Sequence, residues 1–280
     1  MSRRYVMALD EGSTSARAVL VNEEGRIVSE ARNAVVPNFP RTGWVELDPV
    51  ALWQTQRASM EAAMRKVDAT TDDIAAIGVT PHRETCMIWD RKTGEPVHPA
   101  IMWMSKQTDE IVKRWRAEGL DQLIRERTGL FNDSFFSAAK LAWLVENVPG
   151  VKARAEKGEL AAGTVDCWLL WNLTGGRTHA TDHSEASRTA LFGLKALAWD
   201  EEICAASGIP MALLPPALAS SSDFGEMRPE DTGVPGTRPV PITAIMADQQ
   251  AGMFGQACFE PGSVKNTYGT AGVLTANTGA

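Results

Sequence analysis

A glycine, three hydroxyl residues and an arginine lie close together in the segment LDEGSTSAR, residues 9–17. Gly12 would let the backbone turn tightly, so that amide groups can approach an anion closely. The side chains that would add hydrogen-bond donors are Ser13, Thr14, Ser15 and Arg17. Asp10, at the end of an apolar run, could hold a hydrated Mg²⁺. The segment suits a phosphate group, although an ordinary polar hairpin contains the same turn residues and no Walker A lysine follows.

A second set of residues suits a polyhydroxyl ligand. Arg83 and Glu84 are adjacent at the end of an apolar run, where they present a donor fork beside an acceptor. Trp103 could provide an apolar wall for carbon atoms, and Asp248 could act as general base for a hydroxyl nucleophile. Taken singly, each has a more ordinary explanation: a surface ion pair, a core tryptophan and a helix N-cap.

The elements that would position these residues are a mixture of strands and helices. Apolar and alternating runs predict strands at residues 5–9, 16–21, 27–36, 74–79, 86–89, 240–246, 264–267 and 273–276. Helices are predicted from residue 48 onward, at 108–116, 137–147 and 164–173, and from residue 247 onward. Strands first, helices between and strands last predict one α/β domain with a helical insertion. The stretch after Phe254, which contains glycine and proline, is the best candidate for a domain boundary.

The composition of the 280-residue chain argues against several classes of protein. With 28 Lys+Arg against 35 Asp+Glu, the formal net charge is −7, and no basic stripe could neutralise a row of phosphates. No apolar stretch approaches the roughly 20 residues of a membrane helix, and no signal-type apolar region is present. The four cysteines include no CxxC pair, which argues against a zinc site or a disulfide framework. We therefore expect a cytoplasmic protein with no nucleic-acid partner and no membrane insertion.

Eight segments, in order along the whole chain, are similar to segments of one known family. They are ALDEGSTSARAV (8–19), GWVELDP (43–49), IAAIGVT (74–80), RET (83–85), GTVD (163–166), ASRT (186–189), ADQQ (247–250) and KNTYGT (265–270). Each segment alone is a weak signal, but eight in order at family-like spacing are a strong one. Together they resemble the FGGY carbohydrate kinases, and within that family most closely its glycerol kinases.

The resemblance implies a ribonuclease-H-like α/β fold of the actin and hexokinase type, with a mixed sheet and a helical insertion. It implies that residues 1–254 form the domain that carries the substrate site and the phosphate loop. Chains of the family are substantially longer than this one. Residues 255–280 would therefore be the first hairpin of a truncated C-terminal nucleotide-binding domain.

The resemblance also assigns roles to single residues. Those matched to polyol binding are Arg83, Glu84, Trp103, Phe135, Asp248 and Gln249, with Asp248 also matched to the catalytic base. Those matched to the nucleotide phosphates are Ser13, Thr14, Ser15, Arg17 and Thr270, and Asp10 is matched to the magnesium side. The implied reaction is ATP-dependent phosphorylation of a small polyol with Mg²⁺, and glycerol, converted to glycerol 3-phosphate, is the first candidate. A homo-oligomer is left open.

Three positions depart from the pattern usual in glycerol kinases. Pro81-His82 replaces Asn-Gln, Lys106 replaces Arg, and Phe135 replaces Tyr. The last change removes a hydroxyl group at the substrate; because one lost hydrogen bond is worth about 1 kcal/mol, it does not exclude glycerol. The alternatives are a kinase for a substrate of the erythritol, xylulose or ribulose type, and a non-catalytic polyol-binding fragment as the isolated chain.

Overall fold

The chain begins with a three-stranded antiparallel meander, as predicted. The computed structural model describes residues 4–269 and 272–279. The strands are β1 (Tyr5–Glu11), β2 (Ser15–Asn22) and β3 (Ile27–Ala34). Met7 and Leu9 of β1 are fully buried while Val6, Ala8 and Asp10 are more exposed, which is the alternation expected for a strand with one face on the core.

Three further strands extend the meander into a mixed six-stranded sheet. The strand β5 (Ile74–Pro81) lies parallel to β1, and β14 (Val240–Ile245) lies parallel to β5. The short strand β13 (Glu226–Met227) completes the order β13-β14-β5-β1-β2-β3. Because β1, β5 and β14 are parallel, their carboxyl ends lie at one edge of the sheet.

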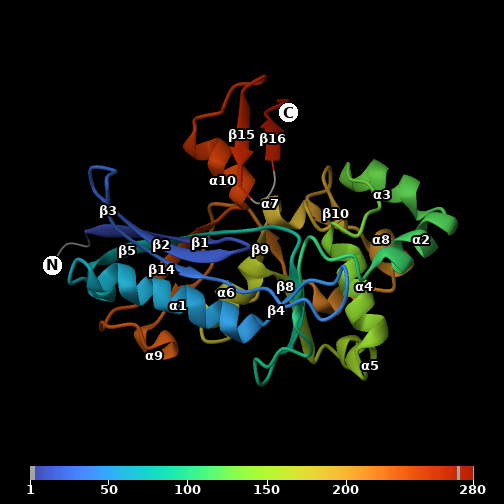
Figure 1. Ribbon diagram of the computed structural model, residues 1–280, viewed down its shortest axis with the longest axis horizontal. Coiled ribbons are helices and arrows are strands. Elements are labelled where there is room, and N and C mark those ends of the chain that lie inside the picture. Colours follow the sequence, from blue (N-terminus) through green and yellow to red (C-terminus); the bar gives the residue numbers. More distant parts are fainter. Residues whose placement is uncertain (1–3, 270–271, 280) are drawn as a thin grey trace.

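The helix α1 (Pro49–Arg65) covers the sheet, as Figure 1 shows. It begins where the sequence predicted, because Asp48 caps its first turn and proline occupies the first helical position. Leu52 and Met60, both almost fully buried, belong to the core that the helix forms with the six strands and with α6 (Val165–Leu173).

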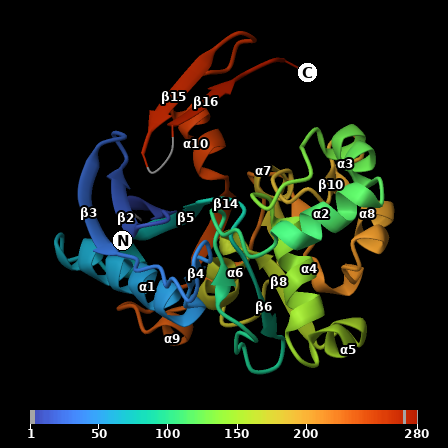
Figure 2. The same cartoon turned by 45° about the vertical axis from the view of Figure 1, so that its right-hand side comes forward.

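A second core lies beside the first one, around a four-stranded sheet. Its strands, in spatial order, are β4 (Glu46–Leu47), β7 (Ala100–Ile101), β6 (Cys86–Asp90) and β8 (Leu160–Thr164). The helices gathered on this side in Figure 2 are α2 (Asp109–Ala117), α3 (Leu120–Thr128), α4 (Ser137–Asn147), α5 (Val151–Glu156) and α8 (Glu201–Ala206). Four of them, α2 to α5, lie between β7 and β8 in the chain and form the predicted helical insertion.

Several short elements lie between the larger ones along the chain. They are η1 (Thr71–Asp73), β9 (Thr181–Asp182), α7 (His183–Ala186), β10 (Phe192–Gly193), β11 (Ala198–Trp199), η2 (Met211–Leu213), β12 (Ala217–Leu218) and α9 (Pro229–Thr232). The structure describes no helix that is both long and apolar enough to cross a membrane. All four cysteines are free, and three of them are buried.

The last part of the chain stands apart from the six-stranded sheet, at the top of Figure 1. The helix α10 (Asp248–Gly255) leads into the hairpin of β15 (Val264–Tyr268) and β16 (Gly272–Ala276), which pair with each other. Most of the hairpin side chains are exposed, Tyr268 among them. The helix ends close to the predicted boundary after Phe254, and the division into two domains stays a prediction.

Candidate active site

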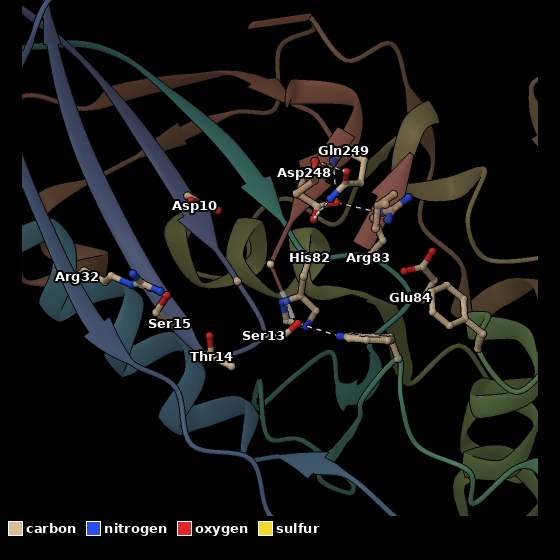
Figure 3. Close-up of a pocket in the computed structure, with 16 residues that line it drawn as sticks. Asp10, Ser13, Thr14, Ser15, Arg32, His82, Arg83, Glu84, Asp248 and Gln249 are labelled. Carbon is tan, nitrogen blue, oxygen red and sulfur yellow. Dashed lines mark hydrogen bonds and ion pairs between the residues drawn. The ribbon is translucent and has the colours of Figure 1, made fainter. Parts of the chain in front are cut away.

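A cavity of about 280 Å³ opens at the carboxyl edge of the parallel strands β1, β5 and β14. Ligands of open α/β sheets commonly bind at this edge. The cavity is lined by segments from both ends of the chain, including the loop after β1, the residues after β5 and the start of α10 (Figure 3). It brings together every predicted site residue except Arg17 and Thr270. Thr270 lies outside the described residues.

The loop between β1 and β2 forms one end of the cavity. The Gly12 amide donates to the Ser15 carbonyl over 2.9 Å, which closes a tight turn. A Cβ at Gly12 would lie 3.2 Å from that same carbonyl oxygen, so a side chain here would crowd the turn. Ser13, Thr14 and Ser15 line the cavity, with their hydroxyl groups available to an anionic ligand.

Of two arginines near this loop, one lines the cavity and the other does not. Arg17 Nη2 lies 2.8 Å from Asp10 Oδ2, its cross-strand neighbour, and Arg17 is not among the lining residues. Arg32, directly across from Arg17 on β3, does line the cavity, and its Nε donates to Ser15 Oγ over 2.7 Å. The sequence analysis missed Arg32. Its signal lies in the strand register, which places Asp10, Arg17 and Arg32 in one row across three strands.

The magnesium role of Asp10 stays a prediction, and Arg17 lies 2.8 Å from one of its two carboxylate oxygens. Its carboxylate lines the cavity beside the phosphate loop and offers hard oxygen ligands. Magnesium usually keeps several waters and binds proteins through one or two carboxylates plus the substrate's phosphates. The described part of the chain contains no cluster of three or more His, Cys, Asp or Glu side chains suited to a metal. Asp10 therefore suits a hydrated ion carried largely by a nucleotide.

Asp248 is held at both of its carboxylate oxygens. Arg83 Nε lies 2.9 Å from Oδ1 in an ion pair, and Gln249 Nε2 donates to Oδ2 over 3.1 Å. Gln249 is fixed in turn, because Lys265 Nζ donates to its Oε1 over 2.9 Å and also to Thr267 Oγ1 over 2.7 Å. Lys265 reaches Gln249 across Gly252, where a Cβ would lie 2.8 Å from the ammonium nitrogen. Lys265 begins the family-like segment 265–270 but was not predicted as a site residue.

Glu84 is buried at the other side of the cavity, with only 2% of its surface exposed. Arg188 Nε donates to Glu84 Oε1 over 2.9 Å. Burial raises the pKa of Glu84, and the positive charges of Arg83 and Arg188 oppose that rise. The backbone of Glu84 has φ of 65°, an unfavourable conformation for a non-glycine residue that is often found at functional sites. Arg188 was part of a family-like segment but was not predicted as a site residue.

An aromatic corner closes the cavity between these two ends. Trp103 and Phe135 meet edge to face, with ring centroids 5.5 Å apart. Lys140, fully buried at the start of α4, holds the segment around Phe135 by donating to three consecutive backbone carbonyls, those of Ser134, Phe135 and Phe136. Trp103 is anchored to the phosphate loop, because its Nε1 donates to Ser13 Oγ over 2.8 Å.

Known proteins resemble the chain both in sequence and in structure. The glycerol kinase of Symbiobacterium thermophilum is 48% identical over 100% of this chain and 55% of its own length. Glycerol kinase 2 of Thermotoga maritima is 47% identical over 99% of this chain and 55% of its own length. The solved structure of Plasmodium falciparum glycerol kinase with ADP has a TM-score of 0.90 and 32% identity, over 96% of this chain and 53% of that one. The chain thus spans about half the length of the curated relatives it matches.

The comparisons also decide the fold and the family. A gluconate kinase from Lactobacillus acidophilus shares the fold at 21% identity, with a TM-score of 0.86. These likenesses confirm the predicted ribonuclease-H-like fold of the actin and hexokinase type. Residues 5–255 match the FGGY family of carbohydrate kinases, N-terminal domain. The chain therefore belongs to the FGGY family of carbohydrate kinases.

Proposed function

We propose that the protein containing this chain transfers a phosphoryl group from ATP to a hydroxyl group of a small polyol. Glycerol, converted to glycerol 3-phosphate, is the first candidate. The observation that carries the proposal is that Asp248, Arg83 and Glu84 line the same cavity as Ser13 and Thr14 of the loop between β1 and β2. The names of the similar proteins support the same substrate, and the ADP in the Plasmodium falciparum structure supports ATP as donor.

Asp248 is the proposed general base. The ion pair with Arg83 and the hydrogen bond from Gln249 fix the orientation of its carboxylate. Oδ1 already faces Arg83 and accepts from the Gln249 amide over 2.7 Å, whereas Oδ2 accepts only from Gln249 Nε2 among the described residues. Oδ2 therefore keeps lone-pair capacity to accept the proton of an attacking hydroxyl group. Phosphoryl transfer depends mainly on in-line positioning and on neutralised charge, and a fixed base serves the first need.

The polyol would lie between the charged groups and the aromatic corner. Arg83, Glu84 and Gln249 would hydrogen-bond its hydroxyl groups, and Trp103 and Phe135 would cover its carbon chain. Phe135 has no hydroxyl group, so this ring can bind the substrate only through apolar contact.

The phosphate groups would lie over the loop between β1 and β2. Backbone amides near Gly12 and the hydroxyl groups of Ser13, Thr14 and Ser15 supply donors there, and Arg32 adds a positive charge. Arg17 and Thr270 stay predicted phosphate contacts. Asp10 would hold hydrated Mg²⁺, which neutralises phosphate charge when it is bound. We further infer that residues 255–280 begin the nucleotide-binding domain, since the relatives extend well beyond this chain.

The direct test is the release of ADP by the protein expressed from its complete reading frame. Glycerol, erythritol and small ketoses are each supplied with MgATP, and the 280-residue chain is assayed in parallel. We expect turnover that depends on a polyol, highest with glycerol, and negligible turnover by the 280-residue chain alone. Turnover with a ketose only would change the substrate class. A rate of ADP release that is the same with and without each polyol would contradict the proposed function.

A further inference from the structure

A series of hydrogen bonds joins the end of β1 to the aromatic corner of the cavity. Both the His82 amide and His82 Nδ1 lie within hydrogen-bond distance of the Glu11 carbonyl, at 2.7 and 2.9 Å. His82 Nε2 lies 2.8 Å from Thr85 Oγ1, and the Trp103 amide donates to that oxygen over 3.1 Å. Trp103 Nε1 then donates to Ser13 Oγ over 2.8 Å.

The direction of each hydrogen bond follows from whether its two groups can donate or only accept. The Glu11 carbonyl can only accept, so His82 Nδ1 carries a proton. Burial lowers the pKa of His82, which keeps the ring neutral and leaves Nε2 as an acceptor for the Thr85 hydroxyl. The Thr85 oxygen is then free to accept the Trp103 amide. His82 and Thr85 thus fix the backbone from which the indole ring projects.

The last bond of the series leaves one donor unused. An indole N–H can only donate, so Ser13 Oγ must accept from Trp103 and its own proton points elsewhere. Within the described residues, Ser13 Oγ donates to no protein acceptor, while Ser13 itself lines the cavity. Figure 3 shows the ring of His82 beside Ser13, and the dashed line at Ser13 is the hydrogen bond that it accepts from the indole. Both residues lie between Thr14 and Ser15 on one side and Arg83 and Glu84 on the other.

We propose that Trp103 and Ser13 act as one unit, in which the indole N–H orients the Ser13 hydroxyl so that its proton points at the transferred phosphoryl group. This inference rests on the proposed function and adds a link between the two halves of the site. Trp103 covers the polyol and also acts as a positioning residue for the phosphate contact. His82 and Thr85 are positioning residues for Trp103.

A double-mutant cycle on the protein from its complete reading frame tests the link. Ser13→Ala removes the oriented donor, and we expect kcat to fall by about 10-fold to 100-fold, the loss that corresponds to one hydrogen bond to a charged group. Trp103→Phe keeps an aromatic ring at this wall but removes the N–H, together with part of the indole. It should lower kcat at least about 5-fold with Ser13 present, but less than about 2-fold in the Ser13→Ala background, because coupled residues are not additive. Ser13→Thr, which keeps a hydroxyl, should restore most of the rate.

The matched control is Trp171→Phe, because Trp171 does not line the cavity. This variant should leave kcat unchanged. A second readout is the indole ¹⁵N–H resonance of Trp103, identified by its loss in Trp103→Phe; it should move upfield in Ser13→Ala, where its acceptor is gone. Equal effects of Trp103→Phe in both backgrounds, or an unmoved resonance, overturn this inference alone. A wild-type protein without polyol-dependent turnover overturns the proposed function as well.

Discussion

Two carboxyl groups that line the cavity are each paired with an arginine but differ in burial. Asp248 is partly exposed, makes an ion pair with Arg83 and accepts from Gln249. Glu84 is buried, which raises its pKa, and depends on Arg83 and Arg188 to offset that cost. Asp248 therefore keeps contact with the open cavity, while Glu84 is held by its arginine partners at the buried side.

A third carboxyl group, outside the cavity, makes the stability of the chain depend on pH. Asp166 is fully buried at the start of α6 and accepts hydrogen bonds from Thr164 and Thr181. Burial raises the pKa of Asp166 from 3.8 to about 6. The folded chain therefore binds the proton more tightly than the unfolded chain does. This contribution to stability is complete below pH 3.8 and is lost as the pH rises through about 6.

The variant Asp166→Asn tests that dependence. Each pKa unit corresponds to about 1.4 kcal/mol. As the pH rises from 4 to 7, the unfolding free energy of the wild type should therefore fall by up to about 3 kcal/mol relative to that of the variant. Urea denaturation at several pH values in this range measures the difference. The exposed Asp223→Asn is the control for loss of one carboxyl group. Parallel curves for Asp166→Asn and the wild type would contradict the assignment.

At the scale of elements, the helix that covers the six-stranded sheet is capped at its first turn by one side chain. Asp48 Oδ1 accepts from the amides of Val50 and Ala51, over 2.9 and 3.3 Å, and so caps α1. We expect Asp48→Ala to lower the unfolding free energy by about 1 kcal/mol, because those amides lose their acceptor. Asp48→Asn keeps a side-chain oxygen and should lose less. Urea unfolding measures both, and equal losses in the two variants would refute the cap.

The sequence predicted some elements accurately for identifiable reasons. The helix α4 has the predicted bounds Ser137–Asn147, and its apolar residues recur with helical spacing. The meander β1–β3 was found because its apolar runs end at a turn with glycine. The helices α3, α5 and α8 were missed. They have only six to nine residues, and such short helices are stabilised mainly by tertiary packing, which a local pattern does not contain.

The site was predicted in the same uneven way. Family-like segments identified Arg83, Glu84 and Asp248, all of which line the cavity. Arg32 and Arg188 were missed, because each meets the site only through the fold: Arg32 through strand register, and Arg188 through an ion pair with a residue 104 positions away. Local sequence indicates which side chains could take part in chemistry. It does not indicate which arginines, distant in the sequence, will contact them in the fold.

At the scale of the whole molecule, the cavity depends on long-range assembly. Its lining runs from Asp10 in the first strand to Val273 in the last hairpin, and the two cores meet near Trp103. The parallel strands deliver the phosphate loop, the Arg83–Glu84 pair and Asp248 to one edge of the sheet. Asp248, near the end of the chain, therefore lines the same cavity as the loop of Ser13 and Thr14, near its beginning.

Replacing Asp248 tests this account most directly. In the protein from its complete reading frame, ADP release is measured with saturating glycerol and MgATP, and glycerol binding is measured by calorimetry. Asp248→Asn should lower turnover by about 10³-fold or more, since a general base commonly contributes 10²-fold to 10⁴-fold, while glycerol still binds. Asp68→Asn, at a turn with φ of 50° that asparagine tolerates, is the matched control and should keep full turnover. Near-normal turnover in Asp248→Asn would contradict the account.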